Sequence, residues 1–449
     1  MFGLLATNTI AQGDTREVGL DQLVKQGFVI PRAVASRKWP GVANLEVAHV
    51  WVRKGSWHGG YVLEDKSVPG ITPFLVVPGK VTGTPYRLAA NADKSFIGSY
   101  VLGLGFIMTP EEAQALIDRD PRNKDVLYPY LNGEDLNSRW DQSPSRWVIN
   151  FHDWPLNRTA SGLWDKADER QRKLWLQSGI VPHDYPGPVA ADHPECLSII
   201  LEKVKPERAN NNRKVYRDRW WHYAEKRPDL YATIASMDRV LVTARVSPSC
   251  VVTWIRPDIV FHEKIVVFPL NQDGFLAATQ STFHWEWARQ YTSTLGAVTL
   301  NYSPSDCFET FPFPDSLKYL DAIGELYYVH RQSIMRHRRD GLTEVYNRFH
   351  ASDEHSPDIQ RLRELHVEMD RAVADAYGWT DLDLGHDFHE TKQGIRFTVS
   401  ESARREILDR LLALNHQRYA EEVAQGLHDK GSKTKGSPKK AKADQKELF

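Results

Sequence analysis

The sequence predicts an α/β segment, then an irregular α+β domain, then a helical region. Residues 2–6, Phe-Gly-Leu-Leu-Ala, form an apolar run, and residues 14–26 follow it with helical spacing. Short strand-like runs rich in aromatic residues and proline fill residues 61–315, and apolar stripes of helical period fill residues 316–427. Residues 428–449 are dominated by Lys, Gly and Ser, which is typical of a disordered basic tail.

The first 60 residues contain the signals of a parallel strand, a helix and a closing hairpin. The run at residues 2–6 does not alternate with polar residues, and this is typical of a strand covered on both faces inside a parallel sheet. The following helix ends at Gly27, which stands where a helix C′ residue stands. Two strand-like stretches flank the turn signal Pro40-Gly41. We therefore expect residues 1–60 to form the end of a doubly wound sheet.

The second and third segments differ in their periodicity. Between residues 61 and 315, runs such as "ITPFLVVPG", "SRWVINF" and "CVVTWI" predict short strands, and "TPEEAQALIDRD" predicts a helix capped by Thr109. The run "YVLGLGFIM" contains Gly103-Leu104-Gly105, which predicts a packed strand because a lone Gly-x-Gly is weak evidence for a cofactor loop. Between residues 316 and 427, three long stretches carry apolar stripes at helical period.

Composition limits the classes of protein to which the chain can belong. The 449 residues are enough for two or three domains. No apolar run is long enough to cross a bilayer, and no signal peptide is evident. The three cysteines, Cys196, Cys250 and Cys307, fit neither a disulfide framework nor a zinc site, so a cytoplasmic location is expected. The net charge is −1, so a nucleic-acid binder of this composition must concentrate its basic residues on one face.

One segment, "KVKPERANNNRKVYRDRWWHY", combines basic, amide and aromatic side chains. Basic residues suit DNA phosphates, while Asn and Arg suit the edges of adenine and guanine. The alternative is a solvated helix face with ion pairs to Glu207 and Asp218. Three consecutive Asn residues are poor helix formers and predict an exposed loop, which favours DNA contact. The candidate residues are Lys203, Lys205, Arg208, Asn211, Asn212, Arg213, Lys214, Arg217 and Arg219.

Two further arginines lie among apolar strand residues. Arg245 and Arg256 must either face solvent or find a partner. Contact with a DNA groove and a salt bridge to Asp258 or Glu263 both remain open. The nearby His262 lacks the second histidine of a zinc helix, so no metal site is expected.

The segment "FPFP" alternates phenylalanine with proline at residues 311–314. Proline cannot donate a ladder hydrogen bond, so this segment cannot form a central strand. We expect an extended connection between the α+β domain and the helices, with Phe311 and Phe313 buried. Its role is therefore packing.

Six motifs together resemble one family of enzymes. They are "GLLATNTIAQGDTR", "NLEVAHVWVRKG", "LYPYLNGEDLNSR", "RWVINFHDWPL", "YRDRWWHYAEKRPDLY" and "NYSPSDCFETFPFP". From residue 1 to about residue 425, the chain resembles the C-terminal part of large bacterial adenine-specific DNA methyltransferases. These are the MmeI-like enzymes and the related methylases of phage-defence systems such as DISARM.

The resemblance implies a function for each region. Residues 1–60 would end a methyltransferase domain that takes its methyl group from S-adenosylmethionine. Residues 61–315 would be a target recognition domain for double-stranded DNA, followed by the helical region at residues 316–427. The segment after the first strand would line the methyl-transfer cleft, at the sheet edge where open α/β sheets bind ligands. Its candidate residues are Asn8, Thr9 and Gln12.

The chain also departs from the family pattern. The Gly-rich cofactor turn and the Asn/Asp-Pro-Pro-aromatic catalytic motif are absent from this sequence. We therefore expect no catalytic residues in this chain, no S-adenosylmethionine binding by it alone, and a partner chain or half that carries both motifs. The expected function is target recognition for an adenine methyltransferase of restriction-modification or phage defence. The alternatives are a stand-alone DNA-binding specificity subunit and a non-functional gene fragment.

Overall fold

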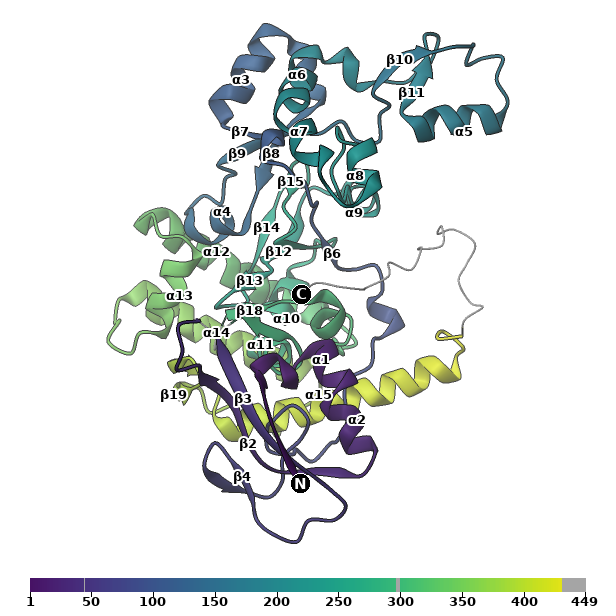
Figure 1. Ribbon diagram of the computed structural model, residues 1–449. Coiled ribbons are helices and arrows are strands. Elements are labelled where there is room, and N and C mark those ends of the chain that lie inside the picture. The colour runs from purple at the N-terminus through teal and green to yellow at the C-terminus, as the bar shows by residue number, and fades with distance from the viewer. Residues whose placement is uncertain (44, 296–298, 430–449) are drawn as a thin grey trace.

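The computed structural model describes residues 1–43, 45–295 and 299–429. Figure 1 shows a small N-terminal sheet at one end, an upper lobe with a projecting arm at the other, and a central sheet with long helices between them. Within these ranges, no helix has both the length and the apolar character that crossing a membrane requires. The predicted tail at residues 428–449 lies almost wholly outside the described residues.

The N-terminal sheet has the strand order β1-β3-β2-β4-β5. Two short helices, α1 and α2, connect β1 to β2, and they meet at Gly19 where one continuous helix was expected. Leu20 of α2 packs with Ile30, Ala33 and Val50 to form a small separate core. The elements are β1 (Phe2–Thr7), α1 (Gly13–Val18), α2 (Leu20–Lys25), β2 (Phe28–Lys38), β3 (Glu46–Lys54), β4 (Tyr61–Leu63) and β5 (Lys66–Val68).

The expected strand, helix and hairpin are present, but the expected burial of the first strand is wrong. β1 is an edge strand that pairs antiparallel with β3 alone, from Phe2 opposite Val52 to Thr7 opposite Val47. Within the described residues its outer backbone edge has no strand partner. Leu5 is 60% exposed and Phe2 is 42% exposed. The apolar run therefore marks a surface of the N-terminal sheet that the described chain leaves open.

The upper lobe contains the sheet β15-β8-β9-β7 and the helices that cover it. Thr109 caps α3 as expected, in a reciprocal capping box with Glu112. The elements are β7 (Ile107–Met108), α3 (Pro110–Arg119), β8 (Leu127–Leu131), α4 (Gly133–Ser138), β9 (Arg146–Ile149), α6 (Pro194–Lys203), α7 (Lys205–Ala209), α8 (Lys214–Asp218), α9 (Pro228–Ile234) and β15 (Val260–Phe261).

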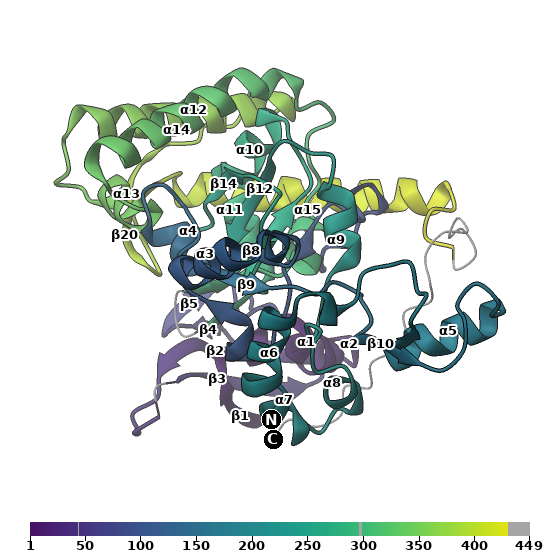
Figure 2. The same ribbon diagram turned by 90° about the horizontal axis from the view of Figure 1, so that it is seen from above.

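An arm projects from this lobe and is clear of the rest of the molecule in Figures 1 and 2. It consists of β10 (Asn157–Ala160), α5 (Glu169–Ser178) and β11 (Ile180–Pro182), and none of the residues of α5 is buried. Trp164 packs against both Trp175 and Tyr185 and holds the arm together.

The central sheet has the strand order β14-β12-β16-β6 and carries most of the apolar packing. Its core is continuous with that of the C-terminal helices, because Leu241 and Phe268 of the sheet share one cluster with Leu362 and Ile407 of the helices. The elements of this sheet and its neighbouring helices are β6 (Phe96–Ile97), β12 (Val240–Ala244), β14 (Val252–Ile255), β16 (Ile265–Phe268), α10 (Asp273–Gln280) and α11 (Thr282–Tyr291). A separate sheet of order β13-β18-β17 consists of β13 (Val246–Ser247), β18 (Thr299–Asn301) and β17 (Ser293–Leu295).

The helical C-terminal region forms as expected, with one addition. Figure 2 shows α12 and α14 side by side over α10, and α15 crossing the molecule beneath them. A hairpin that the helical pattern did not predict, β19–β20, lies between α14 and α15. The elements are α12 (Asp321–Arg338), α13 (Leu342–His350), α14 (Pro357–Ala376), β19 (Asp387–Thr391), β20 (Gly394–Thr398) and α15 (Glu401–Ala424).

Residues 308–313, just before the C-terminal helices, are packed in the main core and contacted by several other segments. Phe311 and Phe313 are buried in the main core, which confirms the expectation for "FPFP". The buried Asn91 donates hydrogen bonds to the carbonyls of Phe308 and Phe311, at 3.2 and 2.7 Å. Trp287 of α11 donates to the Thr310 hydroxyl at 3.0 Å. The segment therefore ties the N-terminal connection to α11.

Two sequence expectations fail locally. The run "ITPFLVVPG" forms no strand, and its Phe74 instead packs edge-to-face on Tyr291. Gly103-Leu104-Gly105 is not a strand either: it enters a short 3₁₀ turn beneath the end of α6. A Cβ on Gly105 would lie 2.5 Å from the Lys203 Cβ, so glycine permits the close approach of α6 there.

Candidate nucleic-acid interface

The basic segment lies on the end of α6, on α7 and α8, and on the loop between α7 and α8. The loop contains the three asparagines, as the sequence predicted, and Asn212 is exposed. The cationic side chains that face solvent are those of Lys203, Lys205, Arg213, Lys214 and Arg217.

Arg208 departs from the surface patch that the sequence predicted. Its side chain is 2% exposed and lies over the Phe106 ring. It donates hydrogen bonds to the carbonyls of Val101 at 2.7 Å, Leu102 at 2.6 and 3.0 Å, and His222 at 2.5 Å. Burial lowers the pKa of this guanidinium to about 10, so it stays charged at neutral pH. Arg208 is therefore the structural centre of the segment, and its charge is not available to a ligand.

The exposed cations of the segment contact neutral groups, which do not offset their charge. Arg213 donates to the Tyr216 hydroxyl at 2.9 Å, and Arg217 donates to the Asn211 carbonyl at 2.5 Å. The Lys205 ammonium lies 5.1 Å from the centre of the Trp220 ring.

Ion pairing was the alternative explanation for these charges. In the described part of the chain, no carboxylate oxygen lies within 4.0 Å of the charged nitrogens of Arg213, Lys214 or Arg217. The alternative pairs to Glu207 and Asp218 are therefore not formed, and this exposed face has a net positive charge suited to phosphate.

Arg219 has a different role from its neighbours. It donates to the carbonyls of Leu176, at 2.6 Å, and Gln177 at the C-terminal end of α5. Its guanidinium also lies over the Trp221 ring. Cations are favourable at a helix C-terminus. Arg219 thus anchors the arm to the basic segment.

Arg245 and Arg256, the two arginines predicted among strand residues, lie at the ends of central strands and not on the basic segment. Arg256 follows β14 and forms an ion pair with Asp258, whose pKa this guanidinium lowers. The salt-bridge alternative therefore holds for Arg256. Arg245 is half-buried between β12 and β13, and its Nε has no hydrogen-bond partner among the described residues.

The segment after β1 joins the N-terminal sheet to the central region. Gln12 exchanges two hydrogen bonds with Thr294, at 3.0 and 2.9 Å. Asn8 is buried and donates to the Ser36 hydroxyl at 3.4 Å, while the Thr9 hydroxyl lies 2.6 Å from that of Thr7. Asn8 and Gln12 line a cavity of about 470 Å³, and Thr9 does not.

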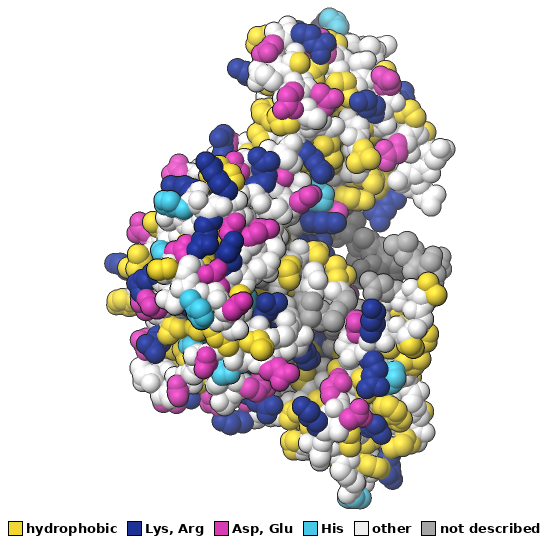
Figure 3. Space-filling model, turned by 90° about the vertical axis from the view of Figure 1, so that its left-hand side faces the viewer, with side chains coloured by type: hydrophobic (Ala, Val, Ile, Leu, Met, Phe, Trp, Pro, Cys, Tyr) yellow, Lys and Arg dark blue, Asp and Glu magenta, His cyan; other side chains and the backbone are white. Residues whose placement is uncertain are grey.

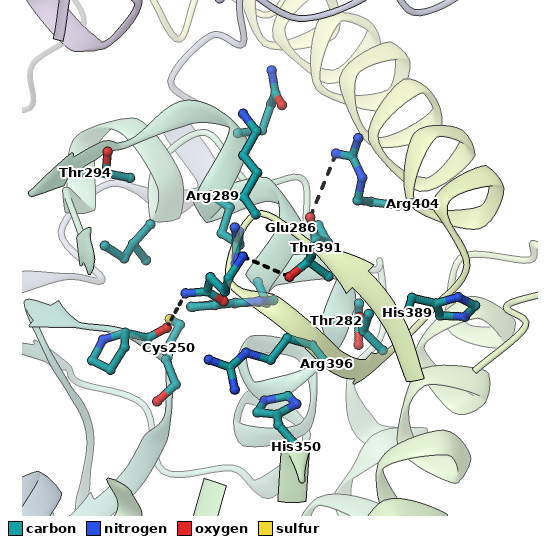
Figure 4. Close-up of a pocket in the computed structure, with 18 of the residues that line it drawn as sticks. Cys250, Thr282, Glu286, Arg289, Thr294, His350, His389, Thr391, Arg396 and Arg404 are labelled. Carbon is teal, nitrogen blue, oxygen red and sulfur yellow. Dashed lines mark hydrogen bonds and ion pairs between the residues drawn. The ribbon is translucent and has the colours of Figure 1, made fainter. Parts of the chain in front are cut away.

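The cavity lies where the N-terminal sheet, α11, α13, the β19–β20 hairpin and α15 meet (Figure 4). The sequence predicted only that the segment after β1 lines a cleft. The other walls were not predicted, because they come from segments up to 396 positions away, from Asn8 to Arg404. The signal that could have indicated it is the density of basic and histidine residues in "HETKQGIRF".

His262 is held by contacts within the protein. Its Nδ1 accepts a hydrogen bond from the Lys264 amide at 2.9 Å, and its ring lies against Tyr130. Among the described residues, no group of three or more His, Cys, Asp or Glu side chains is arranged to hold a metal ion.

Figure 3 shows the face on the side of α12 and α13, where Lys and Arg are interspersed with Asp and Glu. Ion pairs such as Arg338–Asp358, at 2.7 Å, and Arg348–Asp340, at 2.8 Å, account for part of this mixture. Charged residues of the helical region can therefore serve as controls for the unpaired cations of α8.

Comparisons with known proteins find similarity among solved structures. No protein-family model matches the chain, and no curated protein sequence matches it. Among solved structures, the chain matches the Type IIL restriction-modification enzyme MmeI in complex with DNA, with a TM-score of 0.64 and 15% sequence identity. The match covers 93% of this chain and 50% of the other, so the chain spans about half the length of that enzyme. The fold of the chain is therefore shared with part of MmeI.

Proposed function

We propose that this chain is the DNA-recognition part of a restriction-modification enzyme. The single observation that carries the proposal is the uncompensated basic face of α8 and its preceding loop, on a fold shared with an enzyme whose structure contains DNA. Phosphate contacts by such side chains hold a protein on the duplex, and amides such as Asn212 supply base readout.

The finer proposal concerns the reaction. Adenine methylation in duplex DNA requires a flipped base in line with the methyl group of S-adenosylmethionine. The motifs for cofactor binding and catalysis are not in this sequence. We assign methyl transfer to a separate methyltransferase half or subunit, and sequence recognition to this chain, within a restriction or phage-defence system. When bound, the cofactor would supply the methyl group in that other half.

The open edge of β1 supports the existence of such a partner. The unpaired outer edge of β1 can accept another strand, and exposed apolar side chains flank it. We propose that a methyltransferase half completes the N-terminal sheet here by adding a strand to β1.

Hydrogen exchange and one substitution test this partner. In an antiparallel edge strand, alternate amides point away from the only partner, so every second β1 amide is expected to exchange fast in the isolated chain and slowly in the complex. Leu5→Lys is expected to weaken the association at least tenfold, whereas Val42→Lys, in the exposed β2–β3 connection, serves as the control. Equal affinity of the two variants would rule out docking at β1.

Equilibrium titration of duplex DNA tests the recognition role itself. A short duplex should bind saturably, and log Kobs should fall linearly with log salt by about 0.9 per phosphate contact. Absence of saturable binding at low salt would refute the proposed function.

A further inference from the structure

We propose that the cavity between the N-terminal sheet and the β19–β20 hairpin binds a nucleoside phosphate. This goes beyond duplex recognition by α8, because the cavity is built from different elements. Its volume of about 470 Å³ is within the range of small-molecule sites. The ligand chemistry is one phosphate attached to one nucleoside, either as a free nucleotide or as a nucleotide of a nucleic-acid strand.

Three arginines from three elements face the cavity in Figure 4: Arg289 of α11, Arg396 of β20 and Arg404 of α15. Arg289 donates to the Gln393 side chain at 2.5 Å. Arg404 is paired with Glu401 at 2.6 Å and lies 3.9 Å from Glu286.

Arg396 is the cavity arginine whose charge is available to an anion. Within the described residues it has no side-chain hydrogen bond and no ion pair, although it is half-buried in the cavity wall. A partly desolvated guanidinium without a partner is unfavourable, and a phosphate can accept two parallel hydrogen bonds from it.

The acidic groups of the cavity do not neutralise Arg396. Glu286 and Glu401 are both within pairing distance of Arg404, and Glu401 also pairs with Arg405 at 2.7 Å. Glu390 neighbours the basic Lys392 on the same hairpin, and both line the cavity. The charge around Arg396 therefore remains favourable for an anion.

His350 stands beside Arg396 in Figure 4. Its Nδ1 is buried and has no hydrogen-bond partner among the described residues. Burial lowers the pKa of this imidazole to about 3, so it is neutral at pH 7. A neutral imidazole has one N–H donor, which can bind a phosphate oxygen or a sugar hydroxyl.

An aromatic wall completes the site. Trp285 of α11 lines the cavity and is only partly buried, with the Arg289 guanidinium 5.5 Å from its ring centre. A partly exposed indole beside guanidinium groups is suited to stacking on a nucleobase. The combination of indole and guanidinium groups distinguishes a nucleoside phosphate from phosphate alone.

Calorimetric titration with dAMP, with inorganic phosphate and with a short single strand tests the site. We expect dAMP to bind saturably and more tightly than phosphate. Tighter binding of the single strand than of dAMP, with the advantage lost in Arg396→Gln, would identify a strand nucleotide as the ligand of the cavity, and the reverse order a free nucleotide. Arg396→Gln should weaken dAMP binding about tenfold or more, whereas Arg371→Gln, at an exposed arginine of α14, should leave it unchanged.

Trp285→Leu provides a second readout if Arg396→Gln fails to fold, and it should weaken dAMP binding but not phosphate binding. The inference is overturned if dAMP does not saturate, or if both cavity variants bind it like the wild-type chain. It is also overturned if phosphate binds as tightly as dAMP. Duplex binding through α8 is measured separately, so its failure would not mimic any of these results.

Discussion

The triple variant Arg213→Gln, Lys214→Gln, Arg217→Gln is expected to bind duplex DNA about 100-fold more weakly than the wild-type chain at about 0.15 M salt. Each phosphate contact contributes about 0.9 to the salt slope, which corresponds to about 0.7 log unit of affinity at that salt concentration. Three lost contacts therefore reduce the affinity by about two log units and the slope by about 2.7.

A matched variant controls for the general loss of positive charge. Lys318→Gln, Arg336→Gln, Arg371→Gln removes one lysine and two arginines from exposed positions on the helical region. The salt slope of this control should differ from the wild-type slope by less than the value for one phosphate contact, about 0.9. Similar slopes for the two triple variants would show that the α8 face is an ordinary solvated surface.

Replacing Arg208 by methionine is expected to destabilise the upper lobe by about 3–5 kcal/mol. The substitution keeps much of the apolar stem but leaves the carbonyls of Val101, Leu102 and His222 without their donor. Urea denaturation followed by tryptophan fluorescence measures the loss, because Trp220 and Trp221 lie in the same core.

Lys214→Met is the control for this experiment. Lys214 is exposed on α8, so its replacement should change the unfolding free energy by no more than about 0.5 kcal/mol. If Arg208→Met were as mild as this control, Arg208 could not be the structural centre of the segment.

The comparison of Arg208 with Arg213 shows the limit of sequence reasoning. Both are arginines of the same basic run, and nothing in the local sequence separates one from the other. Their environments differ because carbonyls at residues 101–102, more than a hundred positions away, converge on Arg208. Local patterns report charge and helix propensity, but they do not report which side chain a distant segment covers.

The N-terminal sheet shows the same limit. The order strand, helix, hairpin followed from periodicity and turn signals. The strand pairing did not follow, because the paired residues of β1 and β3 are about 40 to 50 positions apart and an apolar run does not specify its partner. The hairpin β19–β20 was missed although Phe388 and Phe397 pair across it, since long helical patterns on both sides dominated the interpretation.

Hydrogen–deuterium exchange of the chain, with and without a duplex a few helical turns long, tests the proposed interface most directly. Binding should slow exchange in residues 210–218, the loop before α8 and α8 itself, and leave α13 at residues 342–350 unchanged. Unchanged exchange at residues 210–218 under conditions where the duplex is bound would contradict the proposed interface.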